Sequence, residues 1–376
     1  MMPVVAIGEL KYKKVYTVLK DEILKGKYSA HGSFPSVMQV CRRFGIARLT
    51  VVKVFDKLKG DGLIVSHWGA GTFVARRGRS RKVGLIVPGI SYSEFFPPIV
   101  SEISRLSQEE GYVLLFGDTM SNDPHERERK TKSFAEQLVA ENVGGVIYQP
   151  LESLMDSDKV NREVVDVFGR HDIPVVLLDC DIVHPPDRSD YDFVGINNYE
   201  AGWRLARHLI EAGARRISFL IRPEWAPTIH ARFRGACFAV SDRGGVAPMA
   251  EAKCQIGTFI AMPADVEALR RHMKRVRPDA FICGNDTTAA KFKQTLESAG
   301  YAVPDDVLLA GFDDVRVASL MTPSLTTIHQ PCEDIARIVF EALISRMENP
   351  QRPTREIFLK APLIVRKSTQ RKGGRR

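Results

Sequence analysis

The sequence predicts an α/β protein with a small basic head and a larger body built on doubly wound parallel sheets. Charge is divided unevenly, because residues 1–82 hold 17 Lys+Arg against 5 Asp+Glu, whereas residues 83–365 hold 31 against 40. Residues 1–75 show helical apolar spacing followed by a hairpin signal. Beyond residue 82, short apolar runs alternate with helical stretches, which is typical of parallel strands covered on both faces. A basic head on an acidic body indicates that one end of the chain binds a polyanion.

Three helices and a hairpin are expected in the head. Apolar residues recur at helical spacing over residues 12–23, and Gly26 closes this helix. Ser36 and Gln39 form an S-x-x-Q capping box at the start of a second helix. Gly45 ends that helix, and a third helix follows and ends at Gly62. The residues expected on its buried side are Val51, Val54, Phe55 and Leu58.

The second and third helices suit DNA binding. A helix, a tight turn and a helix lay the second of the two in the major groove. The turn lies at residues 44–47, so the recognition helix begins near Arg48, which can reach a guanine edge or a phosphate. Thr50 and Lys53 lie on the same exposed side, and the Ser36 hydroxyl can donate to a phosphate. In the alternative interpretation, Arg48 and Lys53 only form a solvated face and Ser36 is only a helix cap.

The head resembles a known family of DNA-binding domains. Its marks are Pro-Ser before the second helix, Arg-x-Thr-Val at 48–51, Leu-x-x-x-Gly-Leu-Ile at 58–64, and Gly-x-Gly-Thr-Phe-Val at 69–74. This pattern resembles the winged helix-turn-helix of GntR-type bacterial regulators over residues 11–75. The resemblance implies DNA contacts from Arg48 and Thr50, and from the wing at His67, Gly69 and Gly71. Met38, Ala47 and Val52 depart from the family's common residues, so the operator sequence is not implied.

Seven apolar runs predict the strands of the body, and so many strands indicate two consecutive lobes. They begin at Lys82, Tyr112, Gly145, Val175, Ile217, Ala280 and Val307. None carries the glycine pattern of a dinucleotide or P-loop site, so no cofactor is expected. The linker is placed at 76–82, the body at 83–366, and a basic disordered tail at 367–376.

Polar residues follow several of these strands. Asp179, Asn285 and Asp313 each follow an apolar run, and Arg232 lies early in the helix after the run from Ile217. Open α/β sheets bind ligands at the carboxyl ends of their strands. Carboxylate, amide and guanidinium groups suit the vicinal hydroxyls of a sugar. The sequence therefore predicts a site for a small polar ligand.

The body resembles the effector domain of LacI/GalR regulators over residues 82–366. The marks are KVGLIVP, YVLLFGDT, VGINNYEAGWRLARHLIEAGARRISFL, FICGND, VPDDVLLAGFDD and SLTTIHQP, in that order. The resemblance implies two lobes like those of type I periplasmic binding proteins. It places Asp179, Arg232, Asn285 and Asp313 at effector-contacting positions, and Phe95 and Phe96 over the ligand. The pairing with a GntR-like head resembles arabinose-responsive repressors of mixed architecture.

Each proposed ligand contact has a structural alternative. Asp286, beside Asn285, is expected to cap the following helix. Asp313 or Asp314 could cap the next short helix, and Asp179 could be a turn residue. Arg232 could pair with a surface carboxylate, and Phe95 could belong to the core between the lobes.

The sequence predicts a DNA-binding repressor controlled by a sugar-like effector and acting as a homodimer on palindromic operator DNA. No membrane span, secretory signal, cysteine framework or metal motif is recognised, so we expect a cytoplasmic regulator without enzyme activity. Two other interpretations remain open. The body could dimerise without sensing a ligand, or it could be a pyridoxal-phosphate enzyme of the aminotransferase type, which needs a Schiff-base lysine and usually a longer chain.

Overall fold

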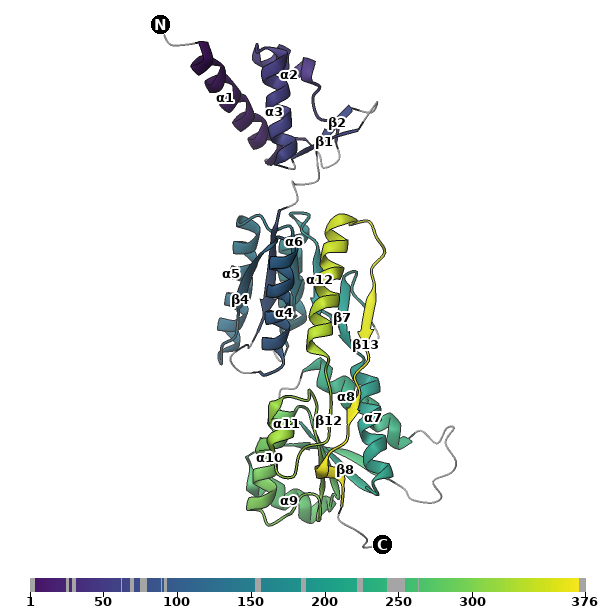
Figure 1. Cartoon of the computed structure of the whole chain (residues 1–376). Helices are drawn as coiled ribbons and strands as arrows, with labels where there is room; N and C mark the ends of the chain where they lie inside the picture. Colours follow the sequence, from purple (N-terminus) through teal and green to yellow (C-terminus); the bar gives the residue numbers. More distant parts are fainter. Residues whose placement is uncertain are drawn as a thin grey trace. The chain divides into compact units, whose positions relative to one another are not determined.

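The computed structural model describes residues 4–24, 27–28, 32–61, 63–67, 71–74, 80–88, 90, 93–152, 157–183, 187–221, 226–241, 254–262 and 264–371. The chain divides into two compact units, Met1–Lys82 and Val83–Arg376, here called the head and the body. Figure 1 labels many of the helices and strands. None of the described helices is both long and apolar enough to cross a bilayer.

The head consists of three helices and a hairpin, as predicted. The elements are α1 (Val4–Leu24), α2 (Val37–Phe44), α3 (Arg48–Gly60), β1 (Ile64–His67) and β2 (Gly71–Val74). Both hydrogen bonds of the predicted capping box form between Ser36 and Gln39, and Gly45 ends α2 at a φ of 62°. His67 lies in β1 rather than in the connection, whereas Gly26 and Gly62 lie outside the described residues.

The apolar side of each head element faces one core. Val51, Val54, Phe55 and Leu58 of α3 are all buried, as their spacing predicts. They pack against apolar residues of α1, α2 and the hairpin. The members contributed by those elements are Val15, Leu19, Ile23, Val40, Ile64 and Val74.

The first lobe of the body contains a six-stranded sheet in the order β13-β7-β6-β5-β3-β4. Its strands are β3 (Lys82–Val87), β4 (Val113–Asp118), β5 (Gly145–Tyr148), β6 (Val175–Leu178), β7 (Asp192–Ile196) and β13 (Glu356–Leu359). Its helices are α4 (Phe96–Glu109), α5 (Pro124–Ala140), α6 (Ser157–Gly169) and α12 (Cys332–Glu348). The expectation that every strand is buried on both faces was wrong for β4, which is largely exposed because it is the last strand of the sheet.

The second lobe contains a parallel sheet in the order β11-β10-β8-β9. Its strands are β8 (Arg216–Ile221), β9 (Gln255–Ile260), β10 (Ala280–Cys283) and β11 (Leu308–Ala310). Its helices are α7 (Asn198–Glu211), α8 (Pro227–Ser241), α9 (Val266–Val276), α10 (Asp286–Ser298) and α11 (Arg316–Leu320). A small antiparallel pair, β12 (Thr327–Ile328) and β14 (Leu363–Ile364), completes it. The chain therefore passes between the lobes three times: before α7, before α12 and after β13.

The end of the chain corrects one prediction. Residues 367–376 were expected to be disordered, but Lys367–Thr369 form a 3-10 helix, η1, in which Ser368 and Thr369 are buried. The Ser368 hydroxyl donates to the Leu309 carbonyl at 2.6 Å, and Thr369 Oγ1 lies 2.8 Å from His208 Nε2. Polar side chains were mistaken for solvated ones because their partners are distant in sequence. Residues 372–376 lie outside the described residues.

A buried ion pair fastens α12 to the first lobe. Arg346 Nε and Nη2 donate to the two carboxylate oxygens of Asp192 on β7, at 2.9 and 3.0 Å. Burial would raise the pKa of Asp192, but the hydrogen bonds from Arg346 and from the Arg355 backbone hold it below its ordinary value. Arg346 also donates to the Pro350 and Pro353 carbonyls in the turn before β13. One side chain thus fixes a helix, a turn and a strand.

Replacing Arg346 should therefore destabilise the body strongly. Arg346→Ala leaves the fully buried Asp192 carboxylate without its main partner, a change that costs about 3–5 kcal/mol. Arg337→Ala is the matched control, because Arg337 is an exposed arginine of the same helix whose ion pairs, with Asp334 and Glu102, lie at the surface. We expect it to change stability by about 0.5 kcal/mol or less. Urea unfolding followed by circular dichroism measures both; equal midpoints would contradict this role for Arg346.

Candidate functional site

The DNA-facing candidates lie at the start of α3. Arg48 is its first residue, and Arg48 and Lys53 are both exposed. Neither makes an ion pair within the described part of the chain. Thr50 is half-buried, and Leu49, which the predicted contacts left out, is 78% exposed. This end of α3 therefore presents two cations and an apolar side chain to solvent, and their contact with DNA stays a prediction.

Arg43, close to these residues in sequence, has a structural role. Its guanidinium donates to Glu22 of α1 and to Tyr28. The hydrogen bond from Arg43 lowers the pKa of Glu22 to about 2, so this carboxylate stays ionised. The pairing ties α2 to α1. Arg43 is thus engaged inside the head, whereas Arg48 and Lys53 make no ion pair among the described residues.

The remaining predicted DNA contacts lie at the start of α2 and in the hairpin. Ser36 caps α2, where its hydroxyl oxygen accepts from Gln39 N at 3.3 Å. His67 pairs with Gly71 across the hairpin, and the φ of 108° at Gly71 is a conformation that favours glycine. Gly69 lies outside the described residues. DNA contact by these residues also stays a prediction.

In the body, the buried guanidinium of Arg232 is the centre of the candidate ligand site. Arg232 lies on α8 and is 4% exposed. Its Nε donates to Asn198 Oδ1 at 2.8 Å, and its Nη1 donates to the Gly284 carbonyl at 2.7 Å. Nη1 also lies 3.6 Å from Asp313 Oδ1. Arg232 is therefore not a surface arginine, and one of its partners, Asp313, is another of the predicted ligand-binding residues.

Asp179 approaches the same guanidinium from the first lobe. It directly follows β6, has a φ of 67°, and is 8% exposed. Its Oδ1 has no hydrogen-bond partner among the described residues. Burial raises its pKa, the positive charge of Arg232 opposes that rise, and the negative charge of Asp313 adds to it. Asp179 therefore lies in a bend, as the turn interpretation expects, and also carries a buried acceptor in the field of Arg232; its contact with a ligand stays a prediction.

Glu152 belongs to this cluster, and the sequence reasoning missed it. It lies beyond the carboxyl end of β5, and its Oε1 accepts from Thr228 Oγ1 at the start of α8, at 3.2 Å. Burial raises the pKa of Glu152 to about 8, and the charge of Asp179 adds to the rise. The signal was available, because Glu152 follows an apolar run as Asp179 does.

The loops after β10 and β11 correct two expectations. Asn285, not Asp286, caps α10, because its Oδ1 accepts from Thr288 N at 2.8 Å. Asp286 is fully buried and accepts from Thr327 Oγ1 and Val315 N. Neither Asp313 nor Asp314 caps α11, whose N-cap position is Val315. Effector contact by Asn285 stays a prediction. Because its Oδ1 caps α10, the contact would come from the amide nitrogen Nδ2.

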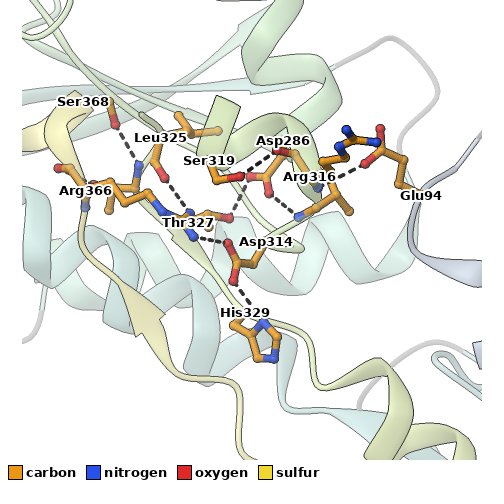
Figure 2. Close-up of polar contacts among 12 residues, drawn as sticks. Glu94, Asp286, Asp314, Arg316, Ser319, Leu325, Thr327, His329, Arg366 and Ser368 are labelled. Atoms are coloured by element: carbon orange, nitrogen blue, oxygen red, sulfur yellow. Dashed lines mark hydrogen bonds and ion pairs between the residues drawn. The ribbon is translucent and has the colours of Figure 1, made fainter. Parts of the chain in front are cut away.

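Figure 2 shows the polar network that supports the loop carrying Asp313. Arg366 Nη2 donates to Asp314 at 2.6 Å, and His329 Nδ1 lies 3.0 Å from the same carboxylate. Asp313 and Asp314 have φ values of 105° and 58°, conformations that are unfavourable outside glycine. The network therefore holds two consecutive strained residues, and the first of them faces Arg232.

The first lobe also contacts this loop region at Glu94. Glu94 Oε2 accepts from the Arg316 backbone N at 3.1 Å (Figure 2). The next two residues, Phe95 and Phe96, are both buried, with ring centroids 4.9 Å apart. They pack in the core with Ile99 and Ile103 of α4. This packing fits the alternative interpretation of Phe95 as a core residue, and cover of a ligand by either ring stays a prediction.

The described residues contain no group of three or more His, Cys, Asp or Glu side chains arranged to hold a metal ion. The cluster around Arg232 combines carboxylates with the guanidinium itself, the Asn198 amide and the Gly284 carbonyl. Such a set binds and orients polar groups.

Comparison with known proteins relates both units to transcription regulators. Residues 11–74 match the family model of bacterial regulatory proteins, gntR family, and residues 206–369 match that of the periplasmic binding protein-like domain. The arabinose metabolism transcriptional repressor of Geobacillus stearothermophilus is 28% identical over 371 residues, covering 94% of this chain and 97% of that protein. The repressor of the same name from Halalkalibacterium halodurans is 25% identical over 376 residues, covering 96% and 97%.

Solved structures agree on the fold of the body. A periplasmic binding protein/LacI transcriptional regulator from Alkaliphilus metalliredigens, in complex with D-xylulofuranose, has a TM-score of 0.62 at 25% identity and covers 77% of this chain and all of that one. A ribose operon repressor from Lactobacillus acidophilus has a TM-score of 0.60 at 20% identity and covers 78% and 99%.

The raised pKa of Glu152 predicts a pH dependence of stability. The folded protein holds a proton that the unfolded chain releases above the ordinary pKa near 4.5. The stability contributed by this group is therefore complete below pH 4.5 and is lost as the pH rises through about 8. The glutamine side chain of the variant Glu152→Gln cannot ionise. The melting temperature of this variant minus that of the parent should therefore increase as the pH is raised from 5 to 9. Parallel curves in a thermal denaturation series would refute the assignment.

Proposed function

We infer that this chain, which joins a GntR-type winged helix-turn-helix head to a periplasmic-binding-protein-like body of the LacI/GalR type, is a transcription regulator controlled by a small ligand. We further propose that it is a repressor and that its effector is a sugar or a closely related polyol. The full-length relatives are named as repressors, and solved relatives of the body hold sugars. The same likeness supports a binding role, not a catalytic one, for the body.

The observation that carries the proposal is the division of chemistry between the two units. The head presents unpaired cations at the start of a helix of the kind that enters the major groove. The body holds a buried guanidinium among acceptors at the carboxyl ends of strands from both lobes. One unit therefore suits a polyanion, and the other suits a small polar molecule.

Control of DNA binding would come from closure of the two lobes. Glu94 and Glu152 of the first lobe accept hydrogen bonds from Arg316 N and Thr228 of the second. A ligand that binds between them favours the arrangement in which these bonds form, as in other hinge-closing proteins. We propose that two copies of the chain pair through the body, so that two heads bind a palindromic operator. The effector then changes the affinity for DNA because lobe closure in the paired bodies changes the relative position of the two heads.

Arg48→Ala should weaken binding to the operator that the parent protein selects from random DNA. A contact from Arg48 to a base edge contributes about 1–3 kcal/mol, so we expect a loss of roughly fivefold or more. Lys57→Ala is the matched control, because Lys57 is an exposed cation of the same helix that is paired with Asp61. Fluorescence anisotropy at fixed salt measures both variants. Equal losses would mean that Arg48 contributes only charge.

Asp313→Asn should give a regulator that binds its operator but does not respond to effector. The change keeps the acceptor for Gln330 and removes the charge beside Arg232, so effector affinity should fall at least tenfold because hydroxyls lose a charged acceptor. Asp305→Asn, at an exposed position of the same lobe, is the control. The probe is whichever pentose or hexose raises the melting temperature of the parent most.

Linkage provides a second check on the same variants. If the sugar weakens operator binding by some factor, the operator must weaken sugar binding by that factor. Titrating sugar with and without operator DNA tests this in the parent. An unaltered response in Asp313→Asn would place the effector elsewhere.

A further inference from the structure

Leu49, in the first turn of α3, has an unusual exposure for a leucine. At 78% exposed, it is the most exposed of the large apolar side chains among the described residues. One side of α3 is buried in the core of the head. Leu49 and Lys53, four residues apart, lie on the opposite side. The leucine therefore contributes nothing to the core and projects from the start of the helix into solvent.

The surroundings of Leu49 indicate which surface covers it. Arg48 directly precedes it, and both Arg48 and Lys53 are exposed and make no ion pair within the described part of the head. Residues 1–82 hold 17 Lys+Arg against 5 Asp+Glu. In a helix-turn-helix, the N-terminal residues of the second helix contact the base edges in the major groove. A leucine between two free cations at this end of α3 therefore faces DNA bases.

Thymine is the base that suits a leucine at such a position. In the major groove, guanine, adenine and cytosine present hydrogen-bond donors and acceptors, whereas thymine also presents its C5-methyl group. A leucine side chain makes no hydrogen bond. Against the other three bases it would displace water from polar atoms without replacing the lost hydrogen bonds, which is unfavourable. Against thymine it buries a methyl group, which is favourable.

We propose that Leu49 is a specificity-determining residue, which selects a thymine of the operator through its C5-methyl group beside the base pair that Arg48 contacts. This inference rests on the proposed function and specifies one base pair of its operator. Consecutive residues of a helix point about 100° apart, so Arg48 and Leu49 reach neighbouring base pairs. Leu49 supplies shape and exclusion of water, and the two cations supply charge.

Replacing thymine by deoxyuridine tests the contact, because deoxyuridine lacks only the methyl group. The operator is the duplex that the full-length parent protein selects from random DNA. Each thymine is replaced in turn in both half-sites, and fluorescence anisotropy at fixed salt gives the Kd of each duplex. The free energy of burying one methyl group corresponds to about a fourfold loss of affinity per half-site. We expect this loss at a thymine beside the base pair at which Arg48→Ala relaxes selectivity.

Leu49→Ala identifies the side chain that makes the contact. At that thymine, the ratio of the deoxyuridine Kd to the thymine Kd should fall from about four to about one per half-site. Leu49→Met keeps a long apolar side chain and should retain most of the ratio. Lys53→Ala is the matched control on the same side of α3. It should weaken both duplexes alike and leave the ratio unchanged, because a phosphate contact does not depend on the base.

Salt dependence gives a second readout on the same variants. An apolar contact releases no counterions, so Leu49→Ala should keep the parent's slope of log Kd against log salt concentration. Lys53→Ala should make that slope shallower, because it removes a contact to a phosphate. A shallower slope in Leu49→Ala would mean that the substitution has displaced the cations, and the assignment of Leu49 would be wrong.

The outcomes distinguish this role of Leu49 from the proposed function. If the parent protein selects no sequence from random DNA, the proposed function fails. If it selects an operator but the ratio at every thymine is the same in Leu49→Ala as in the parent, the regulator stands and Leu49 does not read thymine. If Leu49→Ala changes the oligomeric state or the effector affinity while operator binding is unchanged, Leu49 packs against protein, and the thymine contact is wrong.

Discussion

Burial of the Arg232 guanidinium is the constraint on which the arrangement of the residues around it depends. A buried charge is strongly unfavourable unless ion pairs and hydrogen bonds satisfy it. Asn198 from α7, the Gly284 carbonyl beyond β10 and Asp313 beyond β11 all contribute. Two glycines bring α7 and α8 close enough for this, because a Cβ on Gly202 would lie 1.9 Å from the Arg232 carbonyl oxygen, and one on Gly235 equally near that of Tyr199. The ion pair and the helix crossing therefore depend on each other.

A second ion pair explains why the strained backbone beside Asp313 persists. Consecutive residues with positive φ are unfavourable, and here the Asp314 carboxylate is bound by Arg366 and contacts His329. The partner comes from the last part of the chain, far from the loop in sequence. The Asp313 carboxylate, which lies 3.6 Å from Arg232, is thus held in place by the ion pair of the next residue, Asp314, with Arg366.

Periodicity and caps made the fold largely predictable. The buried face of α3, the capping box of Ser36 and Gln39, and the strands from Lys82, Gly145, Val175 and Ala280 depend on local spacing, and the structure has them. The site was only partly predictable. Strand ends marked Asp179 and Asp313, but the exchange of roles between Asn285 and Asp286 depends on Thr327. Glu152 belongs to the cluster through Thr228, 76 positions away. Such partners are set by topology, which one sequence does not display.

The C-terminal segment has a consequence for how the protein is made. The first lobe receives β13 from residues 356–359, and the second receives β14 and η1 from residues 363–369. Ser368 bonds both Leu309 and Thr326, so it links β11 to the residue before β12. The head is complete within the first 82 residues, and domains fold in order as they leave the ribosome. A nascent chain therefore carries a folded DNA-binding unit while both lobes still lack their last strands. The two lobes can therefore reach their complete sheets only once residues 356–369 have been made.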